Sequence, residues 1–75
     1  MINNRDTAYL KKFGNNLKRL RKDKGLSQEL LCHKADLSKN QIGNIERGEV
    51  NVTLSTIKLI ADALEINIKE LFDFK

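Results

Sequence analysis

Two helix-start signals lie eleven residues apart near the middle of the chain, and they limit what the residues around them can form. Ser27 and Ser38 are both good N-cap residues, and Gln41 completes an S-x-x-Q capping box with Ser38. This spacing leaves room for one short helix and a brief turn before the second helix begins. The run from Gln28 to Arg47, QELLCHKADLSKNQIGNIER, therefore predicts two short helices joined by a tight turn.

The spacing of apolar residues assigns an inner face to each of these two helices. Leu31, Cys32 and Ala35 mark the buried face of the first helix. In the second helix, Ile42 and Ile45 have the same role. The other positions of the second helix fall on one outward stripe, which holds Lys39, Asn40, Gly43 and Asn44.

The chemistry of this stripe suits the edges of base pairs. An Asn or Gln amide can pair with both N6 and N7 of adenine, and a lysine suits the O6 and N7 acceptors of guanine. A polar stripe is also typical of the solvated face of an ordinary helical bundle. The stripe alone leaves both interpretations open.

The rest of the sequence also predicts helices, with no proline, internal repeat or alternating strand pattern. A first helix is expected from about Thr7 to Lys24, ended by Gly25. Thr53 is an N-cap for a helix from about residue 54, and Asn67 with Glu70 predicts a short last helix that ends near residue 72. The residues expected to face inward are Leu10, Phe13, Leu17, Leu20, Leu54, Ile57, Ala61 and Leu64. We therefore expect a compact all-α bundle of five helices.

In its order of motifs the chain resembles the phage repressor and Cro-like (XRE-type) helix-turn-helix family. The resemblance spans Phe13 to Phe72, and its matching pieces are Gly14, Leu17, Leu20, Arg21, Gly25-Leu26-Ser27-Gln28, Leu31, Ile42, Ile45-Glu46-Arg47-Gly48 and Ile60-Ala61-Asp62-Ala63-Leu64. The family usually has alanine at position 32, where this chain has Cys32, and glycine at position 36, where it has Asp36. Cysteine is a small hydrophobe and aspartate tolerates a left-handed backbone, so both changes fit the fold. Leu30 stands at a usually polar position, and nothing in the sequence explains it.

The resemblance implies one DNA-binding domain over residues 1–75, similar to that of lambda repressor, with its motif at about 28–47. The residues expected to contact bases in double-stranded DNA are Lys39, Asn40, Gln41, Gly43 and Asn44. Gly43 would let the helix approach a base closely, whereas a capping role would hold Gln41 near Ser38. The residues expected on the DNA backbone are Ser27, Gln28, Ser38, Arg47 and Asn51, together with the first amides of the two helices.

A structural ion pair is expected between Arg21 and Glu46. Each lies beside a core position, Leu20 or Ile45, and the family often joins its first and third helices through these sites. The alternative is two exposed charges that do not meet.

The charge distribution agrees with a nucleic-acid partner. The net charge is +4, and residues 1–50 hold eleven Lys or Arg against six Asp or Glu, whereas residues 51–75 hold three against four. The basic half is therefore the half with the candidate recognition helix, and such a surplus favours salt-dependent binding to phosphates. The basic run from Lys18 to Lys24 can equally be a solvated helix face.

Several other classes of protein are not expected. The start of the chain lacks the apolar run of a signal peptide, and no stretch approaches the roughly twenty apolar residues of a membrane span, so we expect a cytoplasmic protein. One cysteine and one histidine, Cys32 and His33, cannot make an internal disulfide and do not suggest a zinc site. No nucleophile and base, carboxylate pair or phosphate loop predicts an enzyme, and we expect no metal, cofactor or small-molecule ligand.

One recognition helix covers few base pairs, so specificity normally requires a two-fold dimer on a palindromic operator. The C-terminal part has more apolar residues than one small core needs, and Leu59, Ile68, Phe72 and Phe74 are the expected homodimer contacts. The alternative, that such residues only complete the core, applies most strongly to Ile66 and Leu71.

Within the family, the small size and layout look most like restriction-modification controller proteins, or like Cro-like repressors of phages and mobile elements. A controller would both repress and activate, and Glu29 is a candidate contact for RNA polymerase. The alternative function is an antitoxin, in which the same fold binds DNA and a toxin. Antitoxins usually carry an added toxin-binding segment, and this sequence ends three residues after Phe72, which counts against that alternative.

Overall fold

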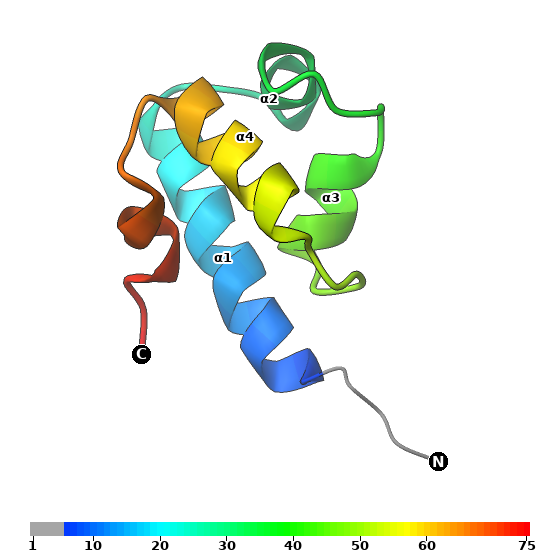
Figure 1. Ribbon diagram of the computed structural model, residues 1–75, viewed down its shortest axis with the longest axis vertical. Coiled ribbons are helices and arrows are strands. Elements are labelled where there is room, and N and C mark those ends of the chain that lie inside the picture. The colour runs from blue at the N-terminus through cyan, green and yellow to red at the C-terminus, as the bar shows by residue number, and fades with distance from the viewer. Residues whose placement is uncertain (1–5) are drawn as a thin grey trace.

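The computed structural model describes residues 6–75, which form four α-helices and a final 3-10 helix and contain no strand (Figure 1). The elements are α1 (Thr7–Asp23), α2 (Gln28–Lys34), α3 (Gln41–Glu46), α4 (Leu54–Leu64) and η1 (Ile68–Phe72). In Figure 1, α4 crosses in front of α1, while α3 and η1 lie on opposite sides of α1. The all-α prediction is confirmed. Residues 1–5, on which part of the signal-peptide argument rests, lie outside the described residues.

The expected fifth α-helix is a 3-10 helix instead. Its Asn67 and Glu70 form the complete capping box predicted from the sequence. However, the amides of Glu70 and Asp73 donate to carbonyls three residues back, at 2.9 and 3.3 Å. Five residues between two loops leave little room for the four-residue hydrogen-bond ladder of an α-helix, so the tighter winding forms.

Side-chain caps fix the starts of α2 and α4 as predicted. Ser27 Oγ accepts from the Leu30 amide at 3.0 Å, and Thr53 Oγ1 accepts from the Thr56 amide at 3.2 Å. Each of these contacts satisfies one amide that the first turn of a helix leaves without an internal partner.

The start of α3 differs from the prediction. Ser38 is not the N-cap, because α3 begins at Gln41 after Asn40, which makes no capping hydrogen bond. Half of the expected box is nevertheless present, since Gln41 Oε1 accepts from the Ser38 amide and hydroxyl, each at 3.0 Å. The contact closes the turn that precedes the helix. The S-x-x-Q pattern is the same whether Ser38 or Asn40 is the N-cap, so only the backbone conformation distinguishes the two possibilities.

The core lies between α1, α2, α3, α4 and η1. Its completely buried members are Leu17, Leu31, Ile42, Ile60, Leu64 and Leu71. The prediction that Leu54 faces inward is wrong, because this first residue of α4 is 75% exposed. Ile60, which was not predicted, is fully buried. Helical spacing placed Leu54 in line with Ile57, but it does not tell where the neighbouring elements end.

A close approach of two backbones sets the distance between α1 and α3. A Cβ added to Gly14 in α1 would lie 2.5 Å from the carbonyl oxygen of Glu46 in α3, well inside normal contact. Just beyond α3, Gly48 has φ +73°, and a Cβ there would lie 2.9 Å from the backbone nitrogen of Lys11. The absence of two side chains therefore lets α3 and the following turn lie directly on α1.

The last element is tied to α1 by a buried amide. Asn16 Nδ2 donates to the carbonyl oxygens of Glu70 and Leu71, both at 2.9 Å, and its Oδ1 accepts from Arg19 Nη2 at 2.7 Å. The side chain thus gives the Leu71 carbonyl a partner and adds a second hydrogen bond to the Glu70 carbonyl, which also accepts from the Asp73 amide. Asn16 was not predicted, because a single Asn on a helix gives no sign of a partner 54 residues away.

Gly14→Ala is expected to destabilise the fold by about 1 to 3 kcal/mol, because the added methyl group meets backbone atoms that cannot rotate away. In a domain of this size that corresponds to a fall in Tm of very roughly 4 to 20 °C. Thermal unfolding followed by circular dichroism measures it. Asn15→Ala, at the exposed neighbouring position, is the control and should leave Tm almost unchanged. Equal Tm values for the two variants would contradict the close approach.

Candidate nucleic-acid interface

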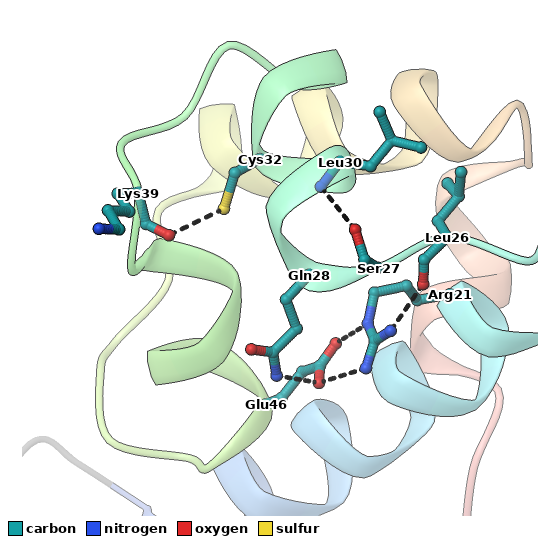
Figure 2. Close-up of polar contacts among 8 residues, drawn as sticks. All are labelled: Arg21, Leu26, Ser27, Gln28, Leu30, Cys32, Lys39 and Glu46. Carbon is teal, nitrogen blue, oxygen red and sulfur yellow. Dashed lines mark hydrogen bonds and ion pairs between the residues drawn. The ribbon is translucent and has the colours of Figure 1, made fainter.

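A tight turn joins α2 to α3 and sets the angle between them. Asp36 has φ +56°, the left-handed conformation for which the family usually has glycine. The Leu37 amide donates to the Cys32 carbonyl at 2.9 Å, and the Cys32 thiol lies 3.5 Å from the Lys39 carbonyl (Figure 2). The departure at position 36 is thus accommodated, since aspartate adopts this conformation more readily than most residues. Cys32 is buried, as its place in the apolar pattern predicted.

The expected ion pair joins α1 to α3. Arg21 Nε donates to Glu46 Oε2 at 2.6 Å, and Arg21 Nη2 donates to Glu46 Oε1 at 3.1 Å (Figure 2). Only 8% and 3% of the two side chains are exposed, so the alternative of two separate surface charges is wrong. This two-bond geometry is the strong form of the arginine-carboxylate contact.

Two further contacts complete the network around this pair. Arg21 Nη1 donates to the Leu26 carbonyl at 2.7 Å, and Gln28 Nε2 donates to Glu46 Oε1 at 2.9 Å. In Figure 2 the side chains of Gln28 and Arg21 approach the Glu46 carboxylate from α2 and α1 respectively. The network therefore holds α3 against both other helices. Among the described residues, no buried side-chain nitrogen or oxygen lacks a partner.

Most of the predicted base-contacting residues lie on the accessible side of α3. Lys39 and Asn40 are exposed, and Gln41 and Asn44 are half-buried. The Gln41 side chain is held at Ser38, as the capping argument predicted. Asn44 Oδ1 accepts from Arg47 Nη2 at 2.6 Å, one turn further along the helix.

Gly43 differs from its expected place. It is buried, and a Cβ built there would lie 3.1 Å from Arg47 Nη1 and 3.2 Å from Gln28 Oε1. The ends of two long side chains therefore cover Gly43, and its contact with a base stays a prediction. The six-residue helix is too short for helical spacing alone to show that long side chains from its end and from α2 fold over this position.

The residues expected on the DNA backbone all lie at the surface. Gln28, Arg47 and Asn51 are exposed, and so are Ser27 and Ser38, whose hydroxyls make the capping and turn contacts described above. A surface hollow of about 290 Å³ lies where α1, α2 and the end of α3 meet, and it is lined by Lys11, Asn15, Lys18, Gln28, Glu46 and Arg47.

Lys11 and Lys18 were not singled out from the sequence. Their spacing with Asn15, at i, i+4 and i+7, places them on one face of α1, and this is the signal that was available. The sequence does not show that this face lies beside α3, because that depends on how α1 and α3 cross.

The apolar C-terminal residues are only partly used inside the protomer. Phe72 is 40% exposed and its ring centroid lies 5.1 Å from that of Phe13. Phe74 is half-buried against Tyr9, at 5.2 Å between centroids. On α4, Leu59 is 44% exposed, whereas Ile68 is half-buried beside the core. The alternative proposed for Leu71, that it completes the core, is confirmed by its full burial.

The part of the chain from residue 6 onward contains no cluster of three His, Cys, Asp or Glu side chains placed to hold a metal ion. None of its helices has the length and apolar character needed to cross a membrane.

A short helix with exposed polar residues, held on a preceding helix by a tight turn and a buried network, is the arrangement of a helix-turn-helix DNA-binding domain. The family model HTH_3, described as helix-turn-helix, matches residues 17–71. The chain belongs to this XRE-type helix-turn-helix family and is a DNA-binding transcription regulator.

Several proteins that are similar to this chain are named control or controller proteins. The control protein C.MunI of a Mycoplasma species is 44% identical over 81% of this chain and 84% of its own length. The control protein C.BamHI of Bacillus amyloliquefaciens is 41% identical over 83% of this chain and 78% of its own. The crystal structure of the restriction-modification controller protein C.AhdI from Aeromonas hydrophila superimposes with a TM-score of 0.85 at 48% identity, covering 87% of this chain and 98% of that one.

Removing one partner of the buried ion pair is expected to cost about 3 to 5 kcal/mol of unfolding free energy, because the other charge remains buried without its partner. Glu46→Gln tests this with little change of shape, and urea unfolding measures it. The control is Asp62→Asn, which breaks the exposed Lys58–Asp62 pair and should cost at most about 1 kcal/mol. A loss for Glu46→Gln no larger than that of the control would contradict the structural role of the pair.

Proposed function

We propose that this regulator binds a palindromic operator as a homodimer and acts as a restriction-modification controller or a Cro-like repressor. The observation that carries the proposal is the set of accessible polar side chains just before and on α3, a helix that the buried Arg21–Glu46 network holds against α1 and α2. The similarity to C.MunI, C.BamHI and C.AhdI supports the choice of a controller. Each of these proteins aligns with this chain over most of both lengths, which favours the same single-domain organisation.

Base recognition is assigned to three residues. Lys39 and Asn40 are exposed just before and at the start of α3, and Asn44 follows one turn later. Lysine suits guanine and an amide suits the edges of bases in the major groove. Gln41 has a smaller role, because its side-chain oxygen is occupied at Ser38.

Phosphate binding is assigned to the margins of α3. Arg47 and Gln28 reach the surface beside the hollow that Lys11 and Lys18 also line. Lys11, Lys18 and Arg47 all belong to residues 1–50, the half of the chain that carries the positive surplus. Neutralising phosphates there releases counterions and gives affinity that falls steeply with salt. Ser27, Ser38 and Asn51 are the further backbone contacts that we propose.

Dimerisation is assigned to the C-terminal face. Leu59 and Phe72 leave about two fifths of their surfaces exposed, and an apolar hollow of about 160 Å³ next to Phe72 is bordered by Tyr9 and Phe13. An exposed apolar surface of this kind favours contact with a second copy. Ile68 and Phe74 complete the proposed interface. Glu29 is exposed on α2 and is the residue that we propose for contact with RNA polymerase.

Asn40→Ala is expected to relax discrimination at particular base pairs by about 1 to 3 kcal/mol, because it removes one amide contact to a base edge. Fold and non-specific affinity should change little, since the side chain is exposed. Fluorescence anisotropy on duplexes substituted at each position of a selected operator measures the effect.

Lys18→Gln provides the matched comparison in the same assay. It removes a proposed phosphate contact, so it should weaken binding to all duplexes alike and reduce the slope of log affinity against log salt by about one. Identical base preferences for wild type and Asn40→Ala would contradict the assignment of α3 as the recognition helix. A wild-type affinity that does not change with salt would contradict the proposed phosphate contacts.

Phe72→Ala is expected to weaken self-association and therefore operator binding, because it removes a large apolar side chain from the proposed interface. Analytical ultracentrifugation over a concentration series measures the dimer constant. Leu54→Ala serves as the control, since Leu54 is more exposed than Phe72 but lies outside the proposed interface. Thermal unfolding separates loss of the contact with Phe13 from loss of the dimer. An unchanged dimer constant would place the interface elsewhere.

A further inference from the structure

The outward face of α1 carries a band of cations that extends beyond the phosphate contacts assigned above. The positions concerned follow the spacing i, i+1, i+4, i+7, i+8 and i+11, so they share one side of the helix. All of them are exposed, and they are Lys11, Lys12, Asn15, Lys18, Arg19 and Lys22. We call this set the α1 stripe.

Almost no negative charge offsets the cations of the α1 stripe. The only acidic residue in α1 is its last one, Asp23. Asp23 Oδ2 lies 3.4 Å from Arg19 Nη1, and more than half of each side chain is exposed. An exposed pair of this kind is weak and is screened by salt, so Arg19 can exchange Asp23 for another anion. The sixth cation of the helix, Arg21, is buried against Glu46 and does not belong to the stripe.

Two surface hollows lie along the α1 stripe, one on each side of it. The first is the hollow of about 290 Å³ beside α3, where phosphate contacts are proposed above. The second hollow has about 300 Å³ and is lined by Lys12, Asn15, Asn16, Arg19, Phe74 and Lys75. Asn15 lines both hollows, so they adjoin across the helix. The buried Asn16 holds Arg19 in the second hollow, because its Oδ1 accepts from Arg19 Nη2 at 2.7 Å.

The composition of the α1 stripe fits a phosphate backbone better than a protein surface. Interfaces between proteins are depleted of lysine and have an apolar centre. The stripe instead consists of four lysines, one arginine and one amide, without an apolar side chain. Such a set gains affinity by replacing the counterions of phosphates. Since the stripe continues from the hollow beside α3, the partner that it fits is the duplex already proposed to lie on α3.

We propose that the α1 stripe binds phosphates of the operator duplex that lie beyond the base pairs contacted by α3. This rests on the proposed function, in which α3 contacts base edges. From residue 11 to residue 22 the stripe is about 16 Å long, a length over which each strand of a duplex carries about five phosphates. Because α3 and η1 lie on opposite sides of α1 (Figure 1), a duplex that reaches the second hollow curves around α1. The contacts along the stripe offset the elastic cost of that bend.

Lys12→Gln and Lys22→Gln test the proposal, because both residues belong to the stripe but do not line the hollow beside α3. Each variant should bind all duplexes more weakly, and the slope of log affinity against log salt should fall by about one per protomer. The control is Lys58→Gln, which removes the same charge from α4, where Asp62 pairs with it, and should leave the slope unchanged. Fluorescence anisotropy over a salt series measures the slopes. Tm should change little in all three variants, since the side chains are exposed.

Ethylation of single phosphates shows where on the duplex the contacts lie. With wild type, ethylation should weaken binding at phosphates outside the base pairs at which Asn40→Ala changes discrimination. With Lys12→Gln, part of that outer interference should disappear, whereas interference within those base pairs should remain.

Three outcomes would each overturn the proposal: an unchanged slope in Lys12→Gln or Lys22→Gln, an equal fall in Lys58→Gln, or ethylation interference confined to the base pairs contacted by α3. Sequence preference in wild type together with a smaller slope in Lys18→Gln would then leave the proposed function intact. Absence of any sequence preference in wild type would overturn the proposed function itself.

Discussion

The buried pair of Arg21 and Glu46 is the interaction on which the geometry of the rest depends. Apolar contacts between helices tolerate small shifts, but a desolvated charge pair is stable only where its hydrogen bonds are complete. Arg21 satisfies this condition through Glu46 and the Leu26 carbonyl, and Glu46 through Arg21 and Gln28. Because these partners come from α1, the loop before α2, α2 itself and α3, one arrangement of the three helices meets the condition. Gly14 makes this arrangement possible, since a larger residue would hold α3 away from α1.

The same network links the core to the surface that we propose binds DNA. Gln28 donates to the buried carboxylate while its own oxygen lies near Gly43, and Arg47 lies over the other side of that glycine. A small residue in the middle of a short helix thus gathers two long polar side chains, one from α2 and one from the end of α3. The side chains of Gln41, Asn44 and Arg47 therefore already make hydrogen bonds within the protein, whereas those of Lys39 and Asn40 do not.

The sequence predicted the features that depend on local chemistry. The caps at Ser27, Thr53 and Asn67, the left-handed residue in the turn and the ion pair are all present, because each follows from a short motif or from the family pattern. The sequence did not predict the features that depend on which other elements pack against a residue. Leu54 and Gly43 have the expected helical phase, but the former is three quarters exposed and the latter is covered by two side chains. Asn16 gave no local signal, because its partners are far away in the sequence. The spacing of Lys11 with Asn15 and Lys18 gave a shared helix face but did not show that this face lies beside α3.

The buried Asn16 has a consequence for association. By holding the carbonyls of Glu70 and Leu71, it orders η1 within a single protomer, so Phe72 is already placed for the dimer contact that we propose. Ordering a flexible segment at an interface costs conformational entropy and lowers affinity. Here η1 is already ordered in the folded protomer, so binding does not carry that cost. Assembly of the proposed dimer would then be the docking of two rigid bodies, which is reversible and depends on protomer concentration. A regulator built in this way can follow its own abundance without refolding at each encounter.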